Sequence, residues 1–231
     1  MAFNVATLKT RSLTALIFVV FMLGGLLWNE WSFLALFSLV HFGCWLEFNK
    51  ILKKIYTKNY LPSLFLGLPY ITLPILLLID LRTNWSGLET SKVAVGIVLP
   101  LLIIFSIWIN DTMAYLVGSL IGKTPFSPIS PKKTWEGTIG GAVLCVLIIG
   151  FGFPLLIGRY FNTHLENNCF VIAAICAVFG TIGDLIESKL KRLANIKDSG
   201  SIMPGHGGFL DRFDSLLIAT PFVWLYLKLF L

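Results

Sequence analysis

Long uninterrupted apolar runs are the feature that most limits how this chain can fold. Seven runs approach the roughly 20 residues that a helix needs to cross the hydrocarbon core of a bilayer. They are 13–28, 31–48, 61–79, 93–109, 138–158, 169–185 and 209–231. Only 13% of the 231 residues are charged, against about 25% in soluble domains. We therefore expect an all-α polytopic integral membrane protein with about seven transmembrane helices.

Segment 112–121 is apolar but too short to span a bilayer, so we expect it to form a separate re-entrant or half-length helix. The sequence shows no internal repeat and no low-complexity linker. We therefore expect a single membrane domain over 1–231, with N-terminal spans in 1–92 and the unusual polar segments in 93–231.

The basic residues are distributed unevenly between the loops. If the N-terminus is cytoplasmic, 14 of the 18 Lys and Arg residues fall in cytoplasmic segments, as the positive-inside rule requires. Seven of the twelve acidic residues fall in three segments on the same side, although that rule takes little account of acids. We therefore expect a polar site at the cytoplasmic surface.

The first polar segment contains the strings WINDTMAY and SPISPKKTWEG. A polar helix cap explains Asn110 alone, whereas Asp111, an acid at the membrane boundary, is a candidate for binding an ion or a partner. The prolines exclude a regular helix and predict an extended loop. Taken alone, Lys132 and Lys133 are ordinary membrane-surface anchors, and the neighbouring Glu136 weakens that interpretation.

The second polar segment, GDLIESKLKR, places an acid, an acid, a hydroxyl and a base on one helix face. These residues are Asp184, Glu187, Ser188 and Lys191, whereas Lys189 points elsewhere. A surface pair between Glu187 and Lys191, worth about 0.3–0.5 kcal/mol, explains two of them. It leaves Asp184 unexplained, and an acid in a span is a functional candidate.

The third polar segment, IKDSGSIMPGHGGFLDRFDS, leads into the last span. Gly207 and Gly208 permit close approach of a ligand to the backbone, and the following helix N-terminus suits a phosphate. Asp211 and Asp214 stand one turn apart on that helix. A turn with a helix cap explains the glycines and one aspartate, but it leaves the second aspartate, Lys197 and His206 unexplained.

Hard oxygen ligands beside basic residues and a glycine-rich turn indicate Mg²⁺ and phosphate groups. Zinc is disfavoured, because His206 is the only histidine nearby and the polar segments contain no thiol. The residues alone therefore predict an integral membrane enzyme that acts on a phosphate-rich substrate at the cytoplasmic surface.

The string SKLKRLANIKDSGSIMPGHGGFLDRFD resembles the signature of the phosphatidate cytidylyltransferases, or CDP-diacylglycerol synthases, almost position for position. NDTMAY and SPKKTWEG also resemble this family, so the likeness covers 108–215. Met203 stands where the family usually has Leu, Ile or Phe, and the chain is shorter than many bacterial members. The first three spans resemble nothing in particular.

The resemblance implies a catalytic region in 93–231 that condenses CTP with phosphatidic acid, giving CDP-diacylglycerol and pyrophosphate. It implies dependence on Mg²⁺, with a second cation left open. Asp184 and Asp211 are the implied metal ligands, and Asp111 and Asp214 remain open as further ligands. Ser188 and Lys191 join Asp184 and Asp211 as the implied catalytic residues. The implied phosphate or nucleotide contacts are Lys132, Lys133, Asn110, Asp111, Arg192, Lys197, Gly207, Gly208 and Arg212.

The expected partners are CTP, phosphatidic acid and the lipid bilayer, without nucleic acid, and a homodimer is left open. The expected location is a bacterial cytoplasmic membrane. A CTP-dependent lipid kinase of the dolichol or phytol type is the alternative, since it would share a nucleotide site but transfer the γ-phosphoryl group. A transporter is disfavoured because no inverted repeat is visible. A CDP-alcohol phosphotransferase is disfavoured because its DGxxAR motif is absent.

Overall fold

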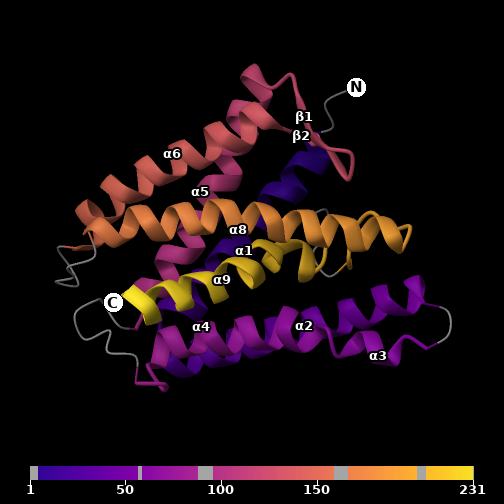
Figure 1. The fold of residues 1–231 in the computed structure, drawn as a ribbon, viewed down its shortest axis with the longest axis horizontal. Helices are drawn as coiled ribbons and strands as arrows, with labels where there is room; N and C mark the ends of the chain where they lie inside the picture. The colour runs from indigo at the N-terminus through magenta and orange to yellow at the C-terminus, as the bar shows by residue number, and fades with distance from the viewer. Residues whose placement is uncertain (1–4, 57–58, 88–95, 159–165, 202–206, 231) are drawn as a thin grey trace. The chain divides into compact units, whose positions relative to one another are not determined.

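The computed structural model describes residues 5–56, 59–87, 96–158, 166–201 and 207–230 (Figure 1). Most of these residues are helical, with a single short hairpin among them. The elements are α1 (Val5–Leu27), α2 (Glu30–Ile55), α3 (Leu61–Leu64), η1 (Leu68–Thr72), α4 (Leu73–Thr83), α5 (Val98–Ile121), β1 (Pro125–Ser127), β2 (Ser130–Thr134), α6 (Trp135–Phe153), η3 (Pro154–Gly158), α8 (Glu166–Leu193) and α9 (Leu210–Phe230).

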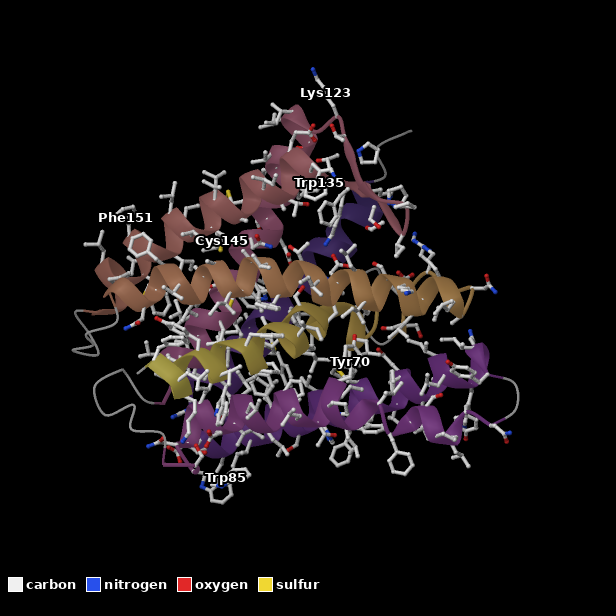
Figure 2. All side chains as sticks on the ribbon, viewed as in Figure 1. Tyr70, Trp85, Lys123, Trp135, Cys145 and Phe151 are labelled. Atoms are coloured by element: carbon white, nitrogen blue, oxygen red, sulfur yellow. The ribbon has the colours of Figure 1, made fainter. Side chains whose placement is uncertain are left out.

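Six helices among the described residues are long and apolar enough to cross a membrane. They are Glu30–Ile55, Leu61–Thr83, Val98–Ile121, Trp135–Leu156, Asn168–Leu193 and Leu210–Phe230, and a shorter apolar helix covers Leu16–Leu27. Large apolar side chains stay exposed along these spans, as at Trp135 and Phe151 on α6 (Figure 2). The prediction of an all-α polytopic membrane protein is confirmed.

Segment 112–121 is not a separate helix, and that prediction is wrong. Helix α5 runs without interruption over 24 residues from Val98 to Ile121. Thr112 Oγ1 donates to the Trp108 carbonyl at 2.7 Å, and Ser119 Oγ donates to the Leu116 carbonyl at 2.8 Å. These polar side chains are satisfied by the helix itself, so they do not end it.

The proline-rich segment after α5 is extended, as predicted. Strands β1 and β2 pair antiparallel, with Ser127 opposite Ser130. Thr134 then caps α6, because its Oγ1 accepts a hydrogen bond from the Gly137 N–H at 3.1 Å. The Glu136 carboxylate accepts from the Thr124 hydroxyl at 2.8 Å, which ties the start of α6 to the start of the hairpin.

Helices α5 and α6 pack through small residues. A Cβ atom on Gly137 would lie 2.7 Å from the Ala114 carbonyl oxygen, and one on Gly141 would lie 2.6 Å from the Ala114 Cα. Gly118 also faces Gly137, so each helix presents small residues four positions apart. This is the pattern that lets membrane helices approach closely, and it holds the hairpin between the ends of α5 and α6.

The contacts divide the chain into two compact units. The first contains Met1–Thr72 and Leu190–Phe213, and the second contains Leu73–Lys189 and Asp214–Leu231. In the first unit, the aromatic ring of Phe37 packs edge-on against that of Phe213. Helices α8 and α9 each continue from one unit into the other. The single domain over 1–231 stays a prediction.

Candidate active site

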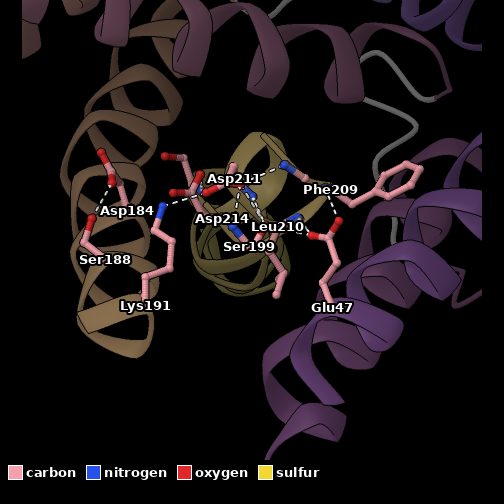
Figure 3. Close-up of polar contacts among 11 residues, drawn as sticks. Glu47, Asp184, Ser188, Lys191, Ser199, Phe209, Leu210, Asp211 and Asp214 are labelled. Carbon is pink, nitrogen blue, oxygen red and sulfur yellow. Dashed lines mark hydrogen bonds and ion pairs between the residues drawn. The ribbon is translucent and has the colours of Figure 1, made fainter. Parts of the chain in front are cut away.

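Helix α8 carries the polar face that its sequence predicts. It is one helix of 28 residues, Glu166–Leu193. Ser188 Oγ donates to Asp184 Oδ1 at 3.2 Å (Figure 3). Glu187, on the same face, is fully buried. A buried acid and a hydroxyl-bonded acid therefore lie within one turn of α8.

Asp214 of α9 joins the two acids of α8 in a group that we call the carboxylate cluster: Asp184, Glu187 and Asp214. One carboxylate oxygen from each lies within 4.8 Å of the others. Glu187 is 0% exposed and Asp214 is 8% exposed. Buried carboxylates at this separation repel one another when charged, and a bound cation or a shared proton relieves that repulsion. Lys133 of β2 supplies one positive charge by pairing with Asp184.

Gly183 allows α8 and α9 to approach closely enough to form this cluster. A Cβ atom on Gly183 would overlap the carbonyl oxygen of Asp214 and lie 3.0 Å from the Cα of Ser215. One turn earlier on α8, the Gly180 carbonyl accepts a hydrogen bond from Ser215 Oγ at 3.0 Å. Close packing at these small residues therefore places Asp214 beside the acids of α8.

We expect the Gly183→Ala substitution to destabilise the protein. The new methyl group would meet backbone atoms of α9, which cannot rotate away, and overpacking of this kind costs about 1–3 kcal/mol. Thermal unfolding in detergent should show a lower Tm. Gly152→Ala in α6 is the matched control, because nothing lies within 4 Å of a Cβ there. Its Tm should stay the same or rise, and equal Tm values for the two variants would contradict tight packing at Gly183.

Asp211, the other expected metal ligand, lies in a hydrogen-bonded network within the first unit. Its carboxylate accepts from Lys191 Nζ at 2.6 Å, from Ser199 N and Oγ at 2.8 and 2.9 Å, and from Gly208 N at 2.7 Å (Figure 3). The Lys191 and Asp211 side chains are 14% and 7% exposed. Gly207 has φ +86°, and a Cβ atom there would overlap Asp211 Oδ2. Gly207 and Gly208 therefore lie against the Asp211 carboxylate. The prediction that Asp211 binds a metal stays a prediction.

Glu47 of α2 is a further buried acid that our reasoning from the sequence missed. It is 2% exposed and accepts hydrogen bonds from Ser199 Oγ at 2.7 Å, Phe209 N at 3.0 Å and Leu210 N at 2.9 Å. The signal was present, because Glu47 is the only acid in the predicted span 31–48. An acid within a span is a functional candidate.

The remaining predicted residues are spread over both units. Asn110 is buried on α5, and its Oδ1 has no hydrogen-bond partner among the described residues. Asp111 follows it and is exposed. Four predicted phosphate contacts are exposed basic residues: Lys132, Arg192, Lys197 and Arg212. Their roles stay predictions, and His206 lies outside the described residues.

The donors of the carboxylate cluster suit a hard divalent cation. Every donor is a carboxylate oxygen, the ligand type that Mg²⁺ and Ca²⁺ prefer. The cluster brings three carboxylates together, and a cation bound among them would lower the repulsion between its members. It contains neither thiol nor imidazole, which disfavours zinc.

Known proteins resemble this chain over about half of its length. The chain is 46% identical over 125 residues to the phosphatidate cytidylyltransferase of Bacillus subtilis. It is 42% identical over 135 residues to phosphatidate cytidylyltransferase 4, chloroplastic, of Arabidopsis thaliana. These matches cover 54% and 58% of this chain but only 45% and 33% of the two relatives, so the chain matches less than half of each relative's length.

The family assignment rests on a longer match. Residues 64–230 match the model of the cytidylyltransferase family, which is well over half of the chain. The polar segments described above, from Asn110 to Asp214, all lie inside this range, whereas Glu47 lies outside it. The resemblance seen in the sequence is confirmed, and the chain belongs to the cytidylyltransferase family.

Proposed function

We propose that this protein transfers the cytidylyl group of CTP to phosphatidic acid, forming CDP-diacylglycerol and pyrophosphate. The family and the printed names of its relatives support this reaction. The membrane spans suit a lipid substrate. The observation that carries the proposal is the carboxylate cluster with Lys133 beside it. A cation held by the carboxylates and the ammonium group of Lys133 could bind several phosphate groups at once.

The reaction needs charge compensation more than it needs a base. A phosphate oxygen of phosphatidic acid attacks the α-phosphorus of CTP and forms a new P–O bond. The bond from the α-phosphorus to the oxygen bridging it to the β-phosphorus breaks, and pyrophosphate leaves with the electron pair. The attacking phosphate monoester is already anionic at neutral pH. The site must therefore offset repulsion between two anions and stabilise the leaving group.

We propose that Asp184, Glu187 and Asp214 hold Mg²⁺. When bound, the ion would neutralise part of the triphosphate charge and stabilise the leaving pyrophosphate. Lys133, which pairs with Asp184, lies where it can also meet a phosphate oxygen. The exposed Arg192 and Arg212 can bind phosphate through two parallel hydrogen bonds. The metal roles expected of Asp211 and Asp111, and a second cation, stay predictions.

We also propose that the site faces the cytoplasm, where CTP is available. The support is the distribution of Lys and Arg, 14 of which fall on the side of the three polar segments. Bacterial relatives support a bacterial cytoplasmic membrane as the location. A homodimer stays a prediction.

Position-specific labelling of CTP tests the reaction. Purified protein in detergent, given phosphatidic acid and Mg²⁺, should move label from the α-phosphorus into the lipid and leave label from the γ-phosphorus in pyrophosphate. A reaction without phosphatidic acid is the control and should give no labelled lipid. Lipid labelled from the γ position alone would contradict the proposal and identify a CTP-dependent lipid kinase.

A further inference from the structure

We propose that Glu47 is a positioning residue for this reaction: from α2 it holds the start of α9 in place and, through Ser199, orients the Asp211 carboxylate. Its kinetic consequence rests on the function proposed above, whereas its contacts do not. Glu47 lies outside the segment that matches the family. Nothing in the family match therefore assigns it a role.

Glu47 caps α9 from another helix. The first N–H groups of a helix have no acceptor within that helix, and the Glu47 carboxylate accepts two such groups, Phe209 N at 3.0 Å and Leu210 N at 2.9 Å. A negative charge is also favoured at the positive end of the helix dipole. The direction and position of the first turn of α9 therefore depend on Glu47.

The same face of α2 seats the Phe209 side chain. Gly43 lies one turn before Glu47, and a Cβ atom on Gly43 would overlap the Phe209 ring. The ring thus occupies the space above Gly43 while the Phe209 N–H bonds Glu47. One residue of the segment before α9 is held twice by α2, once through its ring and once through its backbone.

Two glycines leave space for the Glu47 carboxylate. A Cβ atom on Gly200 or on Gly208 would overlap Glu47 Oε1. Any side chain at either position would push the carboxylate away from its donors. Two glycines of the third polar segment therefore make room for a protein carboxylate.

Ser199 transmits the position of Glu47 to Asp211. Its hydroxyl oxygen lies 2.7 Å from Glu47 Oε2 and 2.9 Å from Asp211 Oδ2. A hydroxyl has one proton and donates to one acceptor at a time. The Ser199 backbone N–H keeps Asp211 bonded at 2.8 Å when the hydroxyl turns to Glu47. Asp211 in turn fixes the Nζ of Lys191 at 2.6 Å.

The Glu47→Gln variant separates a positioning role from a purely structural one. Glutamine keeps the size, but one of its two terminal groups is an NH₂, which cannot accept a hydrogen bond. Phe209 N bonds Oε1 and Leu210 N bonds Oε2, so one of these two bonds is lost whichever way the amide turns. We expect kcat for CDP-diacylglycerol synthesis to fall by about 30- to 100-fold, with the KM for CTP changed by less than about threefold, because small misplacements of reacting groups act mainly on turnover.

Asp80→Asn is the matched control. Asp80 is another buried acid on a span, and it accepts from Ser86 N, Ser86 Oγ and Trp224 Nε1, each at 2.7 Å. Trp224 lies ten residues beyond Asp214 on α9, about 15 Å along the helix. Asp80→Asn should lower the Tm yet keep kcat of the folded protein within about twofold. A Glu47→Gln variant that behaves in the same way would contradict the positioning role.

Hydrogen exchange measures the contact without any assay of activity. In Glu47→Gln, at least one of the amides of Phe209 and Leu210 should exchange faster, whereas Asp80→Asn should leave both protected. Unchanged exchange would refute the proposed contact, and faster exchange with normal kcat would refute the positioning role. A wild-type protein that makes no CDP-diacylglycerol would refute the proposed function. The amide exchange rates would still show whether Glu47 bonds Phe209 and Leu210.

Ser199→Ala keeps the inference testable if Glu47→Gln does not fold. It removes the hydroxyl that joins Glu47 to Asp211 and leaves Phe209 N and Leu210 N on Glu47. We expect kcat to fall by about tenfold with both amides still protected, and less than additive loss in the double variant, because the two residues act through one network. Wild-type kcat in Ser199→Ala would refute the coupling.

Discussion

The Asp214→Asn variant should lose turnover by about 100-fold or more, which is about 2.7 kcal/mol of transition-state stabilisation, while remaining folded. Asparagine preserves the shape of the side chain and keeps an Oδ1 acceptor for the Ser215 N–H, which lies 2.7 Å from Oδ1 of Asp214. It removes one of the three carboxylates of the carboxylate cluster. Steady-state kcat should be measured with CTP and phosphatidic acid at several Mg²⁺ concentrations.

The Mg²⁺ dependence decides how Asp214 acts. If Asp214 holds the ion, raising Mg²⁺ should recover part of the lost activity, whereas Asp80→Asn should show the wild-type dependence. The sequence alone favoured Asp211 over Asp214 as the more sensitive position. Near-normal synthesis by Asp214→Asn at limiting Mg²⁺ would refute the carboxylate cluster as the metal site.

The Lys191→Ala variant should lower turnover by about 100-fold, whereas Lys189→Ala should have a mild effect. Lys191 lies on the Asp184 face of α8, where it is predicted to bind phosphate, and it pairs with Asp211 at 2.6 Å. Lys189 is exposed on the same helix. Loss of a cation that contacts transferring phosphate is expected to act on the transition state. Paired measurements of kcat and Tm should be made on both variants.

Protein stability is the necessary control for Lys191→Ala. Removing the lysine leaves the Asp211 charge buried, although Ser199 and Gly208 still donate to it. The Tm should therefore fall, but the protein should remain folded at the assay temperature. Equal losses of kcat in the two lysine variants would contradict the assignment of the α8 face.

The apolar runs predicted the spans, because a bilayer requires long helices whatever their neighbours are. The ends of the helices were harder to predict. Asn110 and Asp111 suggested that a helix ends there, yet α5 continues to Ile121, and the Thr112 hydroxyl bonds back to the Trp108 carbonyl within it. Hydrophobicity marks where the bilayer lies, whereas hydrogen bonding decides where a helix stops.

The site was predictable only as far as its contacts are local. The face of α8 follows from helical periodicity, so Asp184, Glu187 and Ser188 were grouped correctly on one element. The position of Asp214 beside them depends on the packing of α8 and α9 at Gly183, which no spacing in one segment reveals. Glu47 meets donors more than 150 residues away in the chain.

The long sequence separation of Glu47 from its donors has a consequence for biosynthesis. Ser199 follows Glu47 by 152 residues, so at about 5–20 residues per second the ribosome reaches Ser199 roughly 8 to 30 s later. Until then, α2 carries an acid for which Ser199, Phe209 and Leu210 are not yet present, and an acid in a span is costly. Part of the stability of this early helix is gained only when residues 199–210 are made, so the final packing of α2 waits for the translation of a segment about 150 residues later.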